Sequence, residues 1–231
     1  MTDHINTYCG TLINRGIIEN TKEEVARARK TFGDRLQISM WMELGEGHHD
    51  LSQARELTSG DGIDFVIGSL HKPRNSPDYY EIDYSRKGLD LNELFRVYYD
   101  EMIEMASAGC YDVIGHLNLP LRYMNEYTRA RVDLSSYLGC TRRVLREAAR
   151  AGKGIEINTS SLWRGIGYTL PTAEIVKMFR EEGGEIVTIG SDAHRLEHVG
   201  SALDGGIKCL ASAGFDKFAF YKNRVPHFHN I

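Results

Sequence analysis

The chain has 231 residues, of which 42% are hydrophobic and 26% are charged, so it is long enough to bury a sizeable core. Its net charge of -4 and pI near 6.1 argue against a protein that binds nucleic acid or a membrane by charge. No apolar run approaches the roughly 20 residues of a membrane span, and no signal peptide opens the chain. Four scattered cysteines without a CxxC pair are typical of a reduced protein. We therefore expect one cytoplasmic domain over residues 1–231.

Apolar strand patterns and helical patterns alternate along the chain. We predict strands at Leu36–Met42, Gly62–Gly68, Val113–Gly115, Gly154–Ile157, Ile186–Ile189 and Phe218–Tyr221. We predict helices at Thr21–Phe32, Leu51–Leu57, Leu91–Ala108, Ser136–Ala151, Thr172–Glu182 and Glu197–Ala213. Such alternation predicts an α/β protein with a parallel sheet, either open or closed into a barrel.

Three of these predicted strands deliver a histidine just past their last apolar residue. They are His71, His116 and His194, and Asp192 stands two residues before the last of them. Parallel strands of a barrel bring such positions together at one end, where metal hydrolases place their ligands. Because these candidates come from several strands, and because no GxGxxG loop follows a strand, a barrel is favoured over a dinucleotide-binding sheet.

Two further candidate ligands occupy similar places. Glu43 follows an apolar strand pattern, and a carboxylate can bridge two metal ions. His4 ends the segment Met1–His4, which has the look of another strand end. The neighbouring His48-His49 pair either touches this site or belongs to a polar loop. Glu156, in the middle of a predicted strand, either points inward behind the ligands or is structural.

Basic residues also follow the predicted strands, on the same side as the candidate ligands. They are Arg164, Arg195, Lys72 and Arg74. A guanidinium binds phosphate oxygens in a bidentate manner, so we expect these residues to contact a phosphorylated substrate. The alternative is that they are ordinary charged loop residues.

The ordered set of motifs resembles the PHP (polymerase and histidinol phosphatase) family of metal-dependent phosphoesterases. The motifs are Thr2-Asp3-His4, Glu43, Gly68-Ser69-Leu70-His71, Gly115-His116 and Gly190-Ser191-Asp192-Ala193-His194. The segments Glu156–Ser160, Gly214-Phe215 and Asn223–Pro226 are most similar to its histidinol-phosphatase branch. The resemblance implies a distorted (β/α)7 barrel. Family members open with an HxH strand that is absent from the printed sequence, so we expect a barrel lacking its first strand and part of the second.

The resemblance also implies roles for the candidate residues. His4 and His194 would share one metal, Glu43 and Asp192 a second, and Glu43, His71 and His116 a third. The family site holds up to three divalent ions, such as Zn, Mn or Fe. Without an HxH motif, only the third set is complete, so we expect about one tightly bound ion. His194, Asp192 and His116 are the residues expected to take part in catalysis.

Together these features predict a phosphomonoester hydrolase. By resemblance, the expected substrate is L-histidinol phosphate, and metal-activated water would attack its phosphorus. Two alternatives stay open: a non-catalytic metal-binding remnant of the family, and an enzyme for another small phosphoester. We expect no nucleic-acid or membrane partner, and the sequence leaves homo-oligomer formation open.

Overall fold

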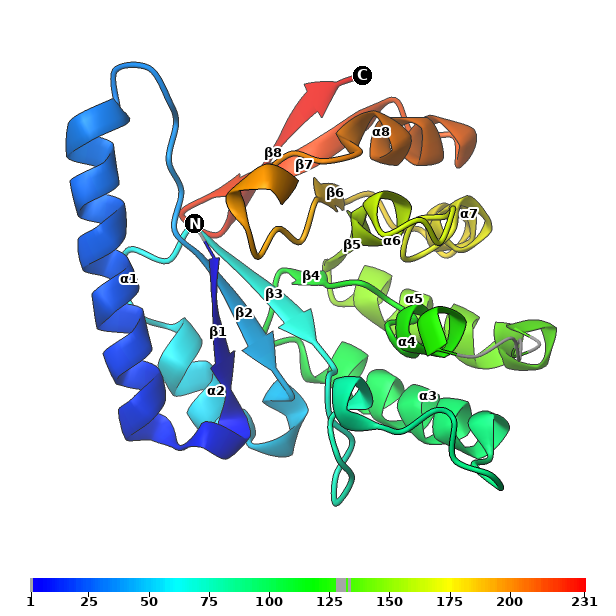
Figure 1. Cartoon of the computed structure of the whole chain (residues 1–231). Helices are drawn as coiled ribbons and strands as arrows, with labels where there is room; N and C mark the ends of the chain where they lie inside the picture. Colours follow the sequence, from blue (N-terminus) through cyan, green and yellow to red (C-terminus); the bar gives the residue numbers. More distant parts are fainter. Residues whose placement is uncertain (1, 128–131, 133) are drawn as a thin grey trace.

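The computed structural model describes residues 2–127, 132 and 134–231, and its centre is a sheet of six parallel strands (Figure 1). The strands pair in the order in which they occur in the chain, each with the next. They are β1 (Thr2–Asn6), β2 (Trp41–Gly45), β3 (Phe65–Ser69), β4 (Val113–Ile114), β5 (Gly154–Asn158) and β6 (Val187–Gly190). The predicted α/β class with a parallel sheet is confirmed. Among the described residues β1 and β6 do not pair with each other, so the sheet has two edge strands.

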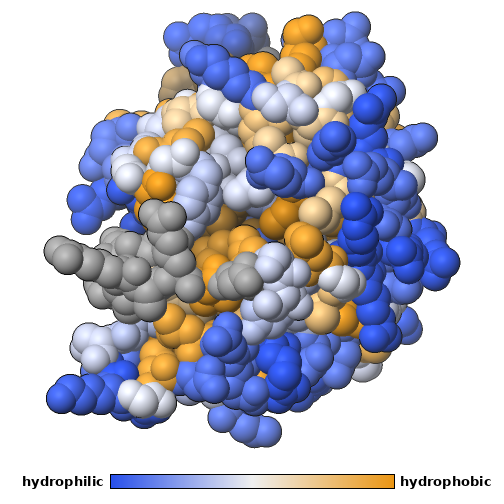
Figure 2. All heavy atoms as spheres, turned by 90° about the vertical axis from the view of Figure 1, so that its right-hand side faces the viewer, coloured by the Kyte–Doolittle hydropathy of each residue, from blue (hydrophilic) through white to orange (hydrophobic). Residues whose placement is uncertain are grey.

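Helices connect the strands and flank the sheet (Figure 1). They are α1 (Thr11–Phe32), α2 (Leu51–Thr58), α3 (Leu91–Ala108), α4 (Pro120–Tyr127), α5 (Leu138–Arg150), α6 (Ser160–Trp163), α7 (Ala173–Glu181) and α8 (Leu203–Ser212). Helices α3, α5, α7 and α8 pack side by side in chain order. On the face that they share, hydrophilic residues form the rim and hydrophobic residues show between them (Figure 2). In the described part of the chain, no helix is long and apolar enough to cross a membrane.

Local sequence signals explain where the helices next to the site begin and end. The Asp50 carboxylate accepts the amide of Gln53 at the start of α2, and the Asp90 carboxylate caps α3 in the same way. Gly109, with a φ of 65°, ends α3 in the left-handed conformation that glycine adopts without strain. Behind the strands, one hydrophobic cluster extends from Ile5 to Ala213.

An antiparallel hairpin, β7 (Lys217–Lys222) and β8 (Val225–Asn230), lies beside β6 and closes the amino-terminal end of the sheet. The ring of Tyr221 stacks on Phe65 at 4.6 Å between centroids. The Arg224 guanidinium, in the hairpin turn, binds Asp112 just before β4 at 2.6 Å from Nε. The hairpin thus fills the apolar end of the sheet's inner face, and the polar side chains are left at the carboxyl end.

Several predicted boundaries are wrong in detail. The strand predicted at Leu36–Met42 is β2, which begins at Trp41 and runs on to Gly45. The Met40 amide donates to the Asp64 carboxylate instead, at 2.9 Å. Glu43 therefore lies within β2 rather than after it.

The first helix is longer than predicted and the last is shorter. Helix α1 begins at Thr11 rather than at Thr21. The sequence pattern missed its first turns because the buried face there includes the polar Asn14, which interrupts the apolar periodicity. The Asn14 amide donates to the Asn6 carbonyl at 2.8 Å and so joins α1 to the end of β1. The helix predicted at Glu197–Ala213 begins at Leu203, and a 3-10 turn over Leu196–His198 precedes it.

Candidate metal centre

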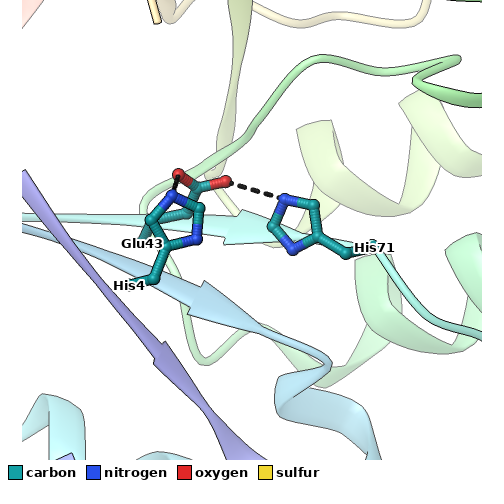
Figure 3. Close-up of side chains that lie close together, drawn as sticks. All are labelled: His4, Glu43 and His71. Atoms are coloured by element: carbon teal, nitrogen blue, oxygen red, sulfur yellow. Dashed lines mark ion pairs between the residues drawn. The ribbon is translucent and has the colours of Figure 1, made fainter. Parts of the chain in front are cut away.

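The Glu43 carboxylate is the centre of the cluster of candidate ligands at the carboxyl end of the sheet. Its Oε2 lies 3.0 Å from His4 Nε2. Its Oε1 lies 3.1 Å from His71 Nε2 and 3.0 Å from His116 Nε2. Figure 3 shows the imidazoles of His4 and His71 on either side of this carboxylate. These side chains come from β1, from β2 and from the segments directly after β3 and β4, so the strand ends converge as the sequence predicted.

Register explains why His4 and Glu43 meet. His4 on β1 is the direct partner of Glu43 on β2, which is in turn the partner of Ile67 on β3. Partners in adjacent parallel strands point to the same face of a sheet. His71 and His116 reach the same point from beyond the last residues of β3 and β4.

The electrostatics of the cluster favour an ionised carboxylate surrounded by nitrogen donors. Burial opposes ionisation of Glu43, but the charge of His4 and the hydrogen bonds from His116 and His71 outweigh it and hold its pKa well below the usual value. Burial likewise lowers the pKa of His71, but the hydrogen bond to Glu43 and its charge raise it to about 9. In the metal-free protein, His71 is therefore a protonated partner of Glu43.

The donor set fits a divalent transition metal. One ligand atom each from His4, Glu43 and His71 lies within 4.8 Å of the others. Imidazole nitrogens together with a carboxylate oxygen suit Zn, Mn or Fe, and no thiolate takes part.

Two buried glutamates hold the ligand-bearing segments in place. Glu46, in the left-handed conformation with a φ of 53°, accepts the amides of His71 at 2.7 Å and Lys72 at 3.0 Å. Glu156 points inward and accepts the amide of His116 at 3.0 Å, and burial raises its pKa. Of the two alternatives for Glu156, the structure shows the inward-pointing one.

Asp192 and His194 lie on the loop after β6 and line the same cavity, which measures about 540 Å³. Among the described residues, the hydrogen-bond and ion-pair partners of Glu43 are His4, His71 and His116. The Asp192 carboxylate lies 3.0 Å from Arg122 Nη2. The His194 side chain is 65% exposed, and its ring centroid is 6.0 Å from that of His4. The cavity is thus lined by His4, Glu43, His116, Asp192 and His194, five of the six predicted metal ligands.

None of the predicted phosphate contacts is among the described residues that line the cavity. Arg195 directly follows His194 and is exposed, with Glu197 at 4.0 Å. The Arg164 guanidinium lies over the Trp163 ring at 4.7 Å. Lys72 Nζ lies over the Tyr8 ring at 5.1 Å.

Arg74 is engaged elsewhere. Its guanidinium donates to Glu104 at 2.7 Å and to the His48 carbonyl at 3.2 Å, on the side of α3. The structure therefore favours Arg195 and Arg164 over Arg74 as residues that could turn towards a bound phosphate.

Sequence reasoning did not find Arg122, which is buried beside Asp192. Arg122 lies in α4, six positions after His116, and no strand end or spacing marks it. It also missed Glu46, although a Gly-Glu-Gly sequence directly after the strand signals a tight turn at this place.

A parallel sheet with imidazoles and carboxylates converging at its carboxyl end is the architecture of metal-dependent α/β barrel proteins. The PHP domain family matches residues 1–160, so the chain belongs to the PHP family.

Similarity to known proteins supports this family assignment. The chain is 28% identical to a probable histidinol-phosphatase of Thermotoga maritima over 71% of its own length and 62% of that protein's. It is 23% identical to a histidinol-phosphatase of Lactococcus lactis, over 86% and 73% of the two lengths. Its fold is similar to a crystal structure of the L. lactis histidinol phosphate phosphatase in complex with zinc, L-histidinol and phosphate. That match has a TM-score of 0.73 and 20% identity, and covers 91% of this chain and 79% of the other.

Proposed function

We propose that the protein is a metal-dependent phosphomonoesterase that hydrolyses L-histidinol phosphate to L-histidinol and phosphate. The observation that carries this proposal is the convergence of three imidazoles on the buried Glu43 carboxylate at the edge of an open cavity. The substrate is suggested by relatives that bear the name histidinol-phosphatase. A solved relative that contains zinc, L-histidinol and phosphate also supports it.

We propose that Glu43, His71 and His116 hold one divalent ion, and that His4, Asp192 and His194 hold further ions more weakly. Such ions, when bound, polarise phosphoryl oxygens and lower the pKa of water. Glu46 and Glu156 keep the backbones of His71 and His116 fixed, so the ligands need little reorganisation when an ion binds.

The residues at the rim have complementary roles in this proposal. Arg195 and Arg164 bind the phosphate oxygens, and Lys72 adds positive charge nearby. When no ion is bound to His194, its exposed imidazole is placed to give a proton to the leaving alkoxide. Asp192, held by Arg122, keeps the His194 loop at the cavity, because His194 Nδ1 lies 3.1 Å from the Asp192 carbonyl.

The test is phosphate release from L-histidinol phosphate after metal removal and reloading with Zn, Mn or Fe. We expect activity only in the reloaded protein, and none in Glu43→Gln. A panel of small phosphomonoesters tests the substrate, and a faster reaction with another member would overturn the assignment of L-histidinol phosphate. If no metal restores activity on any phosphoester while the fold stays intact, the alternative of a non-catalytic metal-binding protein is correct.

We also propose a cytoplasmic location. All four cysteines, Cys9, Cys110, Cys140 and Cys209, are free thiols, as expected for a reducing compartment.

A further inference from the structure

A second cluster of metal-type side chains lies apart from the cavity, between the turn after β2 and helix α3. His48 Nε2 is 2.8 Å and His49 Nε2 is 2.6 Å from Glu101 Oε2. One ligand atom from each of the three residues lies within 4.8 Å of the others. None of the three is among the described residues that line the cavity around Glu43.

The position of Glu101 in the fold is unusual for a carboxylate. It is 7% exposed on α3, close to the fully buried Tyr98 and Met102. A buried carboxylate is costly unless it is paired. Its Oε1 accepts the amide of Arg74 at 2.6 Å, and this leaves Oε2 to face both imidazoles.

The two imidazoles and one carboxylate oxygen meet at a single point. Both Nε2 atoms lie within hydrogen-bond distance of the same Glu101 oxygen. Burial lowers the pKa of His48 and thus disfavours its protonated form. A cation at the point of convergence would take a lone pair from each imidazole and neutralise the carboxylate.

Two features limit the affinity of such a site. Ligation through Nε2 places the His48 proton on Nδ1, where it lacks an acceptor. The guanidinium of Arg74 lies 3.9 Å from Glu101 Oε2, although Glu104 at 2.7 Å offsets its charge. The cluster is therefore expected to bind more weakly than the set around Glu43.

We propose that His48, His49 and Glu101 form a second metal site, for Zn²⁺, with water as the fourth ligand. Two imidazoles and a glutamate with one open position are an established zinc donor set. The ion would tie the turn that follows β2, which also carries Glu46, to helix α3. This proposal does not depend on the phosphatase activity.

The experiment counts zinc ions and measures their affinities by titration of the metal-free protein. We expect wild type to bind one ion more than His49→Ala, and Glu101→Gln to weaken that ion at least tenfold. His71→Ala should lose an ion at the cavity but keep this one. His227→Ala, which removes an exposed imidazole on β8, is the matched control and should match wild type.

Equal zinc number and affinity in wild type and His49→Ala would overturn the proposal. Should the variants misfold, anomalous scattering at the zinc edge from zinc-saturated wild-type crystals decides the matter. A peak between His49 and Glu101 is expected, and its absence refutes the second site.

Discussion

Arg122 and Asp192 form an ion pair inside the cavity, with Arg122 Nη2 3.0 Å from Asp192 Oδ2 and both side chains largely buried. The same guanidinium nitrogen donates to Ser160 Oγ at 2.7 Å. Asp192 has a left-handed backbone with a φ of 52°. The pair therefore connects α4, the start of α6 and the loop after β6 across the site, and it holds Asp192 in a backbone conformation that is uncommon for residues other than glycine.

Replacing Arg122 by methionine should lower the free energy of unfolding by about 3 kcal/mol, because the largely buried Asp192 carboxylate loses its guanidinium partner. Urea denaturation of the metal-free protein measures this change. The control is Arg96→Met, since Arg96 is an exposed residue with two exposed acidic partners. Its loss should cost much less, because exposed ion pairs contribute little to stability. Equal effects of the two substitutions would show that the buried ion pair contributes no more to stability than the exposed one.

Glu43→Gln should abolish tight metal binding at the cavity. The amide keeps the size of the side chain but removes the charge that faces His4, His71 and His116. Loss of a residue that only supports a ligand typically costs about 10–100-fold in metal affinity. Loss of the Glu43 carboxylate should lower the metal affinity by more than this. Isothermal titration with Zn²⁺ measures it, and a Kd within about tenfold of wild type would contradict the central place of Glu43.

Metal affinity at the cavity should rise with pH. The pKa of His71 is raised to about 9 by Glu43, so a proton must leave this residue before it can bind an ion. Below that pKa, each pH unit should change the apparent affinity about tenfold, equivalent to about 1.4 kcal/mol. Competition titrations at pH 7 and pH 8 test this, and a flat profile would show that His71 is not a ligand.

The stability of the metal-free protein should fall as the pH rises. The folded pKa of His71 lies above its ordinary value of 6.5, so protonation stabilises the folded state. This contribution is fully present below pH 6.5 and is lost as the pH rises through about 9. Urea midpoints at pH 6 and pH 9 measure it, and the difference should disappear in His71→Ala.

Gly190→Ala should disturb the metal site by displacing Glu156. A Cβ on this residue of β6 would overlap Glu156 Oε1, and Glu156 holds the His116 amide through its other oxygen. We expect a loss of about 1–3 kcal/mol in the free energy of unfolding, as in other overpacked sites, together with weaker metal binding. The control is Gly16→Ala in α1, where a Cβ meets nothing within 4 Å. This change should instead stabilise the protein by about 0.5–1 kcal/mol. Similar losses in both variants would refute the steric argument.

Arg195→Ala should reduce kcat/KM for phosphoester hydrolysis by roughly 10²-fold if this residue binds the phosphate. Arg195→Lys should restore activity only in part, because an ammonium group cannot reproduce the planar, bidentate guanidinium. Steady-state kinetics of both variants test this. If activity stays within about twofold of wild type, phosphate recognition lies elsewhere, and Arg164 and then Lys72 are the next residues to replace.

The alternation of strands and helices could be predicted from the amino-acid sequence alone, and so could the convergence of Glu43, His71 and His116. Buried parallel strands have a strong local signal, and side chains just past their ends must meet, because parallel strands end at the same edge. The family also follows from these motifs, and the match over residues 1–160 confirms it.

The partners of the remaining residues are visible only in the folded protein. Asp192 meets Arg122 rather than Glu43, and His48 and His49 meet Glu101 on a helix that is distant in sequence. Such contacts depend on how a helix is rotated against the sheet and on loop conformations with positive φ, and neither has a local pattern in the sequence. The group of side chains at the strand ends could therefore be predicted from the sequence. The charged helix residues that pair with neighbouring side chains could not.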